Sequence, residues 1–91
     1  MNLEFSETAK NDLAAIRDHI LKDSLSAAER TLIRIRQSIL YLISFPELGR
    51  PWRDTGTRAL SIAGLPYRVH YEIRGETVYI LTVVHTRRGF P

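Results

Sequence analysis

The sequence predicts an α+β domain of order β-α-α-β-β-β, with a helical hairpin packed on one face of a mainly antiparallel sheet. Apolar residues recur at steps of three and four between residues 9 and 42, which is the period of one helix face. They alternate with polar residues from 67 to 73, which is the period of a half-buried strand. A chain of 91 residues holds one hydrophobic core, so residues 1–91 form one domain.

The first half begins with a short strand at residues 2–5, followed by Ser6 as the cap of a helix. The apolar face of that helix consists of Ala9, Leu13, Ile16 and Ile20. After a break at residues 23–25, Ser26 and Glu29 match the capping box that opens a second helix. Its apolar face consists of Ala28, Leu32, Ile35, Ile39 and Leu42. Proline and glycine at residues 46–51 end this helix, and Trp52 falls in the loop that follows.

The second half predicts three strands, at residues 57–62, 67–73 and 77–85. Gly75 and Glu76 suit a two-residue type II′ turn between the last two strands. An unbroken ladder from this turn pairs Arg68 with Val83 and brings it diagonally next to His85. The register therefore predicts an Arg68–His85 neighbourhood on the sheet face that the helices leave open.

Positive charge is concentrated in the second half of the chain. Residues 1–49 hold six basic and seven acidic side chains, whereas residues 50–91 hold seven arginines, no lysine and three acids. Arginine matches carboxylate and phosphate groups with a planar fork of donors. This half is therefore expected to meet an anion, either a nucleic acid or an acidic protein segment.

Several classes of function are disfavoured. There is no cysteine, and His19, His70 and His85 lack the spacing of metal ligands, so neither a metal nor a cofactor is expected. The first residues do not resemble a signal peptide, and no apolar run approaches the roughly 20 residues of a membrane span. We expect a cytoplasmic protein that does not enter a membrane.

Five short segments, taken in order, resemble the RelE/ParE superfamily of toxins from type II toxin–antitoxin systems. They are F-P-E-L-G-R at 45–50, G-T-R-A-L at 56–60, P-Y-R-V-H-Y at 66–71, V-Y-I-L-T-V-V-H at 78–85 and R-R at 87–88. The resemblance implies a small cognate antitoxin whose flexible, often acidic tail wraps the toxin. Arg30 and Arg34, one helical turn apart, are candidate antitoxin contacts.

The superfamily contains two activities. RelE-like members are ribosome-dependent mRNA endonucleases that need no metal, and the resemblance assigns Arg68 to the scissile phosphate and His85 to acid/base catalysis. The chain departs from that pattern, because Thr86 stands where a tyrosine is common and Arg50 and Arg53 replace loop lysines. ParE-like members lack the nuclease set and inhibit DNA gyrase.

The ending at residues 84–88 is more similar to the ParE branch, so gyrase inhibition is the favoured activity. An mRNA endonuclease is the alternative, and a non-toxic basic binding module is a second alternative. The candidate residues for binding the target or an anion are Arg50, Arg53, Arg58, Arg68, His85, Arg87 and Arg88.

Overall fold

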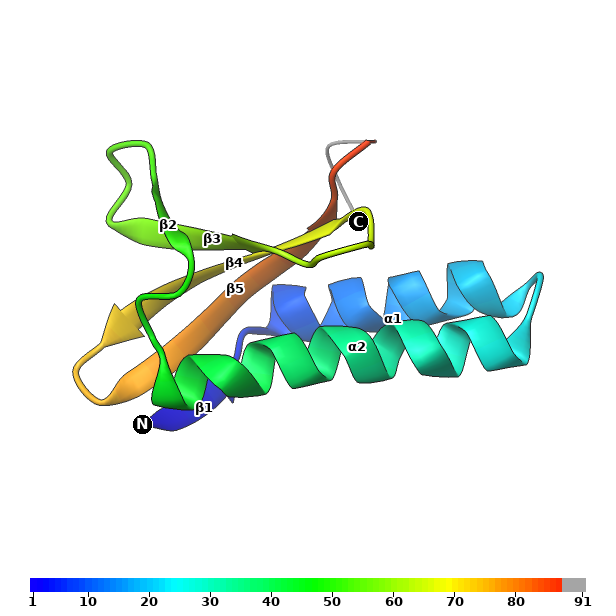
Figure 1. Cartoon of the computed structure of the whole chain (residues 1–91), viewed down its shortest axis with the longest axis horizontal. Helices are drawn as coiled ribbons and strands as arrows, with labels where there is room; N and C mark the ends of the chain where they lie inside the picture. Colours follow the sequence, from blue (N-terminus) through cyan, green and yellow to red (C-terminus); the bar gives the residue numbers. More distant parts are fainter. Residues whose placement is uncertain (88–91) are drawn as a thin grey trace.

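The computed structural model describes residues 1–87, so Arg88 lies outside the described residues (Figure 1). The elements are β1 (Asn2–Phe5), α1 (Glu7–Leu21), α2 (Leu25–Ser44), β2 (Arg50–Trp52), β3 (Thr57–Ser61), β4 (Tyr67–Arg74) and β5 (Thr77–His85). One five-stranded sheet has the order β1-β5-β4-β3-β2. Only the β1–β5 pair is parallel; the other three pairs are antiparallel. The predicted α+β architecture is confirmed, with β2 as an additional strand.

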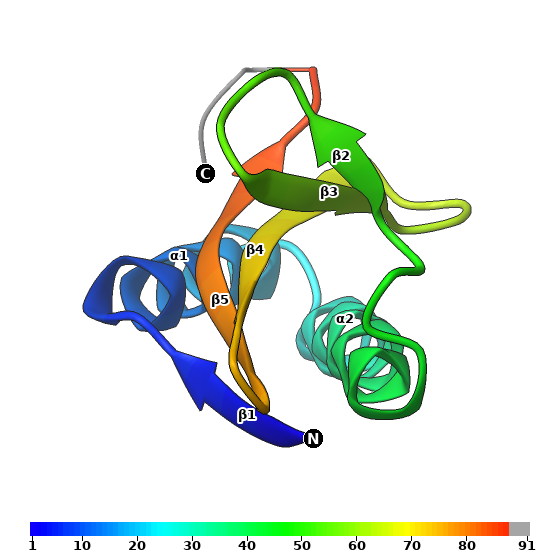
Figure 2. The same ribbon diagram turned by 90° about the vertical axis from the view of Figure 1, so that its left-hand side faces the viewer.

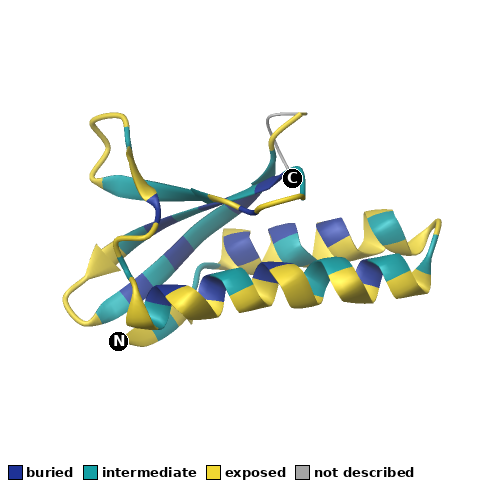
Figure 3. Cartoon of the chain, viewed as in Figure 1, coloured by how far each residue is buried: buried dark blue, intermediate teal, exposed yellow. Residues whose placement is uncertain are grey.

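The two helices lie side by side on one face of the sheet, and their far ends extend past it (Figures 1 and 2). Buried residues line the helix sides that face the sheet and alternate along β4 and β5 (Figure 3). Both predicted helical stripes contribute to this core. Its buried members are Ala9, Ile16, Ile35, Ile39, Leu42, Ile62, Tyr67, Val69, Tyr71, Val78, Ile80 and Val83.

The first helix cap is confirmed and the second is wrong. Ser6 caps α1, and its side chain accepts a hydrogen bond from the Ala9 amide. The cap of α2 is Ser24, which is extended and accepts from the Ala27 amide at 3.0 Å. Ser26 and Glu29 therefore lie inside the helix. Ser24 and Ser26 both match the sequence pattern of a helix cap. The connection after α1 is short, and the earlier serine is the one that caps α2.

The turn between β4 and β5 has two residues, as predicted, because Arg74 pairs with Thr77. Gly75 has φ +58°, whereas Glu76 is not among the residues with positive φ, which is the type II′ pattern. The predicted register holds as far as the Tyr71–Ile80 pair. A bulge then shifts the ladder by one residue, so that Val69 pairs with Val83 and Arg68 with Val84. Val83, rather than Val84, is consequently the core residue.

Two side chains of the first helical region hold the bulge in β5. Ser6 Oγ donates to the Leu81 carbonyl at 2.7 Å, and Asp12 Oδ2 accepts from the Val83 amide at 2.9 Å. The Thr82 hydroxyl also donates to Asp12. β1 pairs with β5 only up to Ile80, so these contacts satisfy backbone groups beyond the end of β1. Asp12 is therefore a buried acid whose hydrogen bonds to β5 stabilise the fold.

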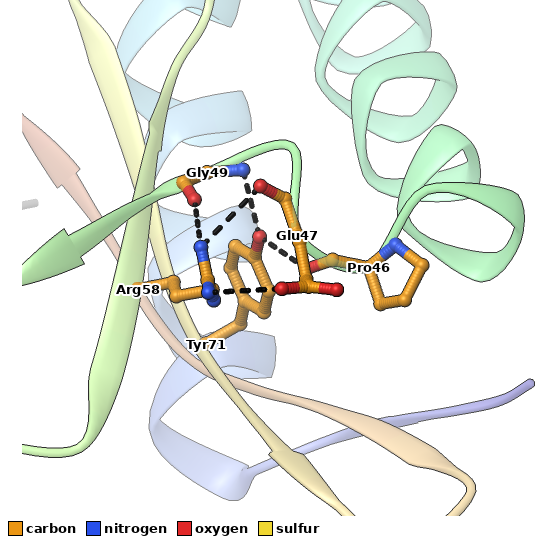
Figure 4. A network of polar contacts seen from close by, with 5 residues as sticks. All are labelled: Pro46, Glu47, Gly49, Arg58 and Tyr71. Atoms are coloured by element: carbon orange, nitrogen blue, oxygen red, sulfur yellow. Dashed lines mark hydrogen bonds and ion pairs between the residues drawn. The ribbon is translucent and has the colours of Figure 1, made fainter.

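A hydrogen-bonded loop connects α2 to the sheet (Figure 4). The buried Tyr71 hydroxyl donates to the Pro46 carbonyl at 2.7 Å and accepts from the Gly49 amide at 2.8 Å. Arg58 donates to the Gly49 carbonyl at 2.7 Å and lies 3.5 Å from a Glu47 carboxylate oxygen. A Cβ on Gly49 would lie 2.7 Å from Tyr71, so this close approach requires glycine.

This loop leads into β2, whose residues were predicted to lie in a loop. Trp52 pairs with Thr57 and Arg50 with Ala59. A three-residue strand is too short for a period to show, and its central Pro51 lacks an amide donor. Proline is tolerated because β2 is an edge strand of the sheet. The result places Trp52 and Arg50 on one face of the sheet.

Candidate anion-binding site on the outer sheet face

Alternation along β4 determines which side chains lie on the outer face, opposite the helices. Tyr67, Val69 and Tyr71 are buried in the core, so Arg68 and His70 lie on the other side. Their neighbours on β3 are small: Ser61 pairs with Arg68, and Ala59 pairs with His70. Short side chains at these positions leave room for a residue from β2.

Trp52 fills that room. The Trp52 and His70 rings meet edge to face, with centroids 4.9 Å apart. The guanidinium carbons of Arg68 and Arg53 lie 4.5 Å and 4.9 Å from the centroid of the Trp52 ring. Such cation–π contacts contribute about 0.5–1 kcal/mol each at exposed sites. Arg50 shares the face of Trp52 on β2, and we call Arg50, Arg53 and Arg68 the arginine cluster.

The backbone at Arg53 is held in an unusual conformation. Its φ of +54° lies in the left-handed region, which costs a non-glycine residue about 1 kcal/mol or more. The turn compensates through Thr55, whose hydroxyl donates to the Trp52 carbonyl at 2.6 Å and accepts from the Thr57 amide at 3.2 Å. The turn therefore holds Arg53 next to Trp52.

The cluster keeps His70 neutral. Arg68 Nε donates to His70 Nε2 at 2.8 Å, which places the imidazole proton on Nδ1. Partial burial, followed by the charges of Arg68 and Arg53, lowers the pKa of His70 below its ordinary 6.5. The charge of this site at neutral pH therefore comes from arginine.

Acidification should destabilise the protein through His70. Because its pKa is lower in the folded state, the unfolded chain takes up the proton first as the pH falls below 6.5. Urea unfolding between about pH 7.5 and about pH 5.5 should show a larger loss of stability for wild type than for His70→Gln. Equal losses in the two proteins would contradict this assignment.

Among the described residues, the arginines of the cluster have no carboxylate partner, in contrast to Arg17, Arg58 and Arg74. Arg58 contacts Glu47, and Arg74 contacts Glu72. Within residues 1–87, Arg50, Arg53 and Arg68 form no ion pair, although Asp54 lies in the same turn as Arg53. The Nη groups of Arg68 also have no protein acceptor among these residues. The site thus presents arginine donors whose charge is not neutralised.

The predicted Arg68–His85 neighbourhood is wrong. The bulge pairs His85 with Tyr67 on the core side, whereas Arg68 pairs with Val84 and lies on the outer face. The His85 and Tyr67 rings meet edge to face at 5.3 Å, and His85 Nδ1 accepts from the Arg87 amide at 3.2 Å. A one-residue shift in the ladder separates the two side chains.

The other predicted residues lie in several places. Arg58 is on the core side of β3, where it holds the loop after α2. Arg30 donates to Ser26, and Arg34 donates to the Ala63 carbonyl. His70 and Trp52 were not predicted as members of a site. His70 could have been predicted, because it is two positions after Arg68 and therefore lies on the same face of the strand. Trp52 could not, because its place in the site depends on strand β2.

A second surface feature is an apolar groove of about 670 Å³ on the helical hairpin. Leu21, Leu25, Leu32 and Ile33 are among its lining residues, and Arg17, Glu29 and Arg36 are also at it. Leu25 is 62% exposed and Ile33 is 52% exposed. The connection between α1 and α2, which adjoins Leu21 and Leu25, lies at the end of the hairpin that extends past the sheet (Figure 1).

Among the described residues, no three His, Cys, Asp or Glu side chains are placed to hold a metal ion. None of the helices in residues 1–87 is long and apolar enough to cross a membrane.

Comparisons with known proteins cover nearly all of the chain. A family model for the ParE toxin of the type II toxin–antitoxin system parDE matches residues 3–90. The protein Y4kP of Sinorhizobium fredii is 39% identical over 79 residues, which cover 87% of this chain and 81% of that protein. Toxin RelE2 of Caulobacter vibrioides is 34% identical over 77 residues, which cover 85% of each protein. The solved structure of a chromosomal ParDE system from P. aeruginosa matches with a TM-score of 0.81 at 26% identity, covering 91% of this chain and 92% of that one.

Proposed function

The chain belongs to the ParE toxin family of type II toxin–antitoxin systems, and from this premise we propose that it inhibits DNA gyrase and is neutralised by a small cognate antitoxin. A gyrase inhibitor needs a complementary surface and no proton-transfer residues. The outer sheet face, with its arginine cluster and neutral His70, is the proposed contact surface.

The separation of Arg68 from His85 is the observation that favours gyrase inhibition over RNA cleavage. Cleavage of RNA by attack of the ribose 2′-hydroxyl needs a base, an acid and a cation around one phosphate. The two residues that the RelE resemblance would assign to this chemistry lie on opposite sides of the sheet. His70, which does lie next to Arg68, accepts a hydrogen bond from it at Nε2 and has a lowered pKa, so at neutral pH it seldom carries the extra proton that a general acid gives up. These observations favour inhibition without catalysis.

The hairpin groove is the proposed site of the antitoxin. Exposed apolar residues such as Leu25 and Ile33 suit the apolar face of a partner helix, and Arg17 and Arg36 at the groove suit acidic residues on it. The solved ParDE relative is likewise a toxin–antitoxin system.

One experiment separates the two activities. Purified toxin is added to a gyrase supercoiling assay and, in parallel, to a translating extract in which messenger lengths are followed. Inhibited supercoiling with intact messengers is expected. Messengers that are cleaved by wild type but not by Arg68→Ala or His85→Ala would support the endonuclease instead, and no effect in either assay would support a non-toxic binding module.

The antitoxin part uses a matched pair of variants on α2. Ile33→Asp puts a charge into the groove, whereas Leu40→Asp changes an exposed leucine of the same helix that does not line it. Ile33→Asp should inhibit gyrase as wild type does but require more antitoxin for neutralisation, by about tenfold or more. Leu40→Asp should be neutralised like wild type. Equal antitoxin requirements for the two variants would place the antitoxin elsewhere.

A further inference from the structure

The outer face combines three properties that point to one class of ligand. The first is charge: the arginine cluster has no carboxylate partner within residues 1–87, and Glu72, two positions from His70 on β4, is held by Arg74. Arg53 and Arg68 both contact the Trp52 ring, and Arg50 shares the face of Trp52 on β2. A group of uncompensated arginines is suited to an anion that carries more than one charge.

The second property is the distribution of exposed apolar side chains. Among the described residues, the large exposed ones are Met1, Leu21, Leu25, Ile33, Leu40, Tyr41, Phe45, Leu48 and Ile73. None belongs to β2 or β3, or to the part of β4 that holds Arg68 and His70. A protein interface has an apolar core, whereas an interface with nucleic acid is polar and positively charged. The outer face fits the second description, and the helical hairpin fits the first.

The third property is the state of the Trp52 ring. The guanidinium groups of Arg53 and Arg68 already lie over the ring, and the His70 ring meets it edge to face. A platform that stacks unpaired bases needs a free aromatic face. Trp52 instead contacts the two guanidinium groups, so their donors are positioned before a ligand arrives. This arrangement favours contacts to backbone phosphates over contacts to unpaired bases.

We propose that the arginine cluster binds the backbone phosphates of duplex DNA, so that the toxin contacts the DNA segment that gyrase holds. The second part rests on the proposed function, whereas binding of DNA does not need gyrase. Recognition through phosphates alone is independent of sequence and depends strongly on salt.

The test measures binding of the purified full chain to a short fluorescent DNA duplex of mixed sequence, over a series of salt concentrations. The double variant Arg53→Gln/Arg68→Gln should bind about tenfold or more weakly, and its slope of log affinity against log salt should be smaller by about 2. The control is Lys10→Gln/Lys22→Gln at α1, which removes two positive charges away from the cluster and should retain most of the affinity. Arg53→Lys/Arg68→Lys, which keeps the charge, should recover part of it.

Each outcome decides the inference. It is overturned if wild type does not bind the duplex, or if the two Gln double variants bind equally well. It is also overturned if a polyglutamate peptide binds wild type more tightly than the duplex and loses affinity in Arg53→Gln/Arg68→Gln, because the ligand is then an acidic protein segment. Tighter binding of single-stranded DNA than of the duplex would assign the site to unpaired strands. Thermal unfolding of every variant checks that it is folded. The gyrase assay is a separate readout, so duplex binding without inhibited supercoiling refutes the proposed function and the contact with gyrase-held DNA, and leaves the duplex-binding part of the inference standing.

Discussion

Replacing Asp12 with alanine is expected to lower the free energy of unfolding by about 3 kcal/mol. The carboxylate is 8% exposed and accepts from the Val83 amide and the Thr82 hydroxyl at the bulge of β5. Alanine would leave the buried Val83 amide without a partner, and hydrogen bonds to a charged acceptor contribute about 1.5–3 kcal/mol each. Urea unfolding followed by circular dichroism measures the change.

Two further variants separate the hydrogen bonds from the loss of a negative charge. Asp12→Asn keeps an oxygen acceptor in place and should retain a large share of the stability. Asp18→Ala removes an exposed acid of the same helix, whose contact with Arg17 is a surface pair worth about 1 kcal/mol or less. If Asp12→Ala were no more destabilising than Asp18→Ala, Asp12 would not hold the bulge.

Replacing Tyr71 with phenylalanine is expected to cost about 2–3 kcal/mol. The ring would remain packed, but the Gly49 amide and the Pro46 carbonyl would lose their shared partner (Figure 4). For a domain of this size, 1 kcal/mol corresponds to about 4–8 °C in Tm, so a thermal melt resolves the effect.

The matched control is Tyr79→Phe, whose ring lies against Arg74 on the surface side of β5. This change should stay within about 0.5 kcal/mol. Burial raises the pKa of the Tyr71 phenol above its ordinary 10.0. Since the unfolded chain ionises first above that pH, wild type should also lose more stability than Tyr71→Phe in strong alkali. Equal stability of wild type and Tyr71→Phe at neutral pH would show that the loop is held by other contacts.

The helices and the long strands were predictable because each repeats its period several times. The stripe from Ala28 to Leu42 spans four turns, and β4 alternates over its buried residues, so single exceptions do not obscure either pattern. The bulge was not predictable from the sequence of β5, because residues 77–85 are apolar on both sides and fit either register. What determines the register is Asp12, which is 71 positions away from Val83.

Only part of the candidate site was predictable, because some of its residues follow from a pattern within one segment and others depend on contacts between segments. Arg68 follows from the alternation of β4, and Arg50 and Arg53 follow from the charge of the second half. Trp52 joins them through a three-residue edge strand, and His70 acquires its role from Trp52 and Arg68. The site depends on contacts between secondary-structure elements, and the pattern of residues along one segment does not reveal such contacts.

The pairing of β1 with β5 also has a consequence for synthesis of the protein on the ribosome. The second residue of the chain aligns with Thr77, and Ser6 and Asp12 reach partners 75 and 71 positions later. Non-local pairing of this kind slows folding, because distant parts of the chain must meet before the contacts form. The helical hairpin can form early from local contacts, but the sheet cannot be completed until the last strand has been translated. A nascent toxin can therefore form its helical hairpin before the core face of the sheet is complete.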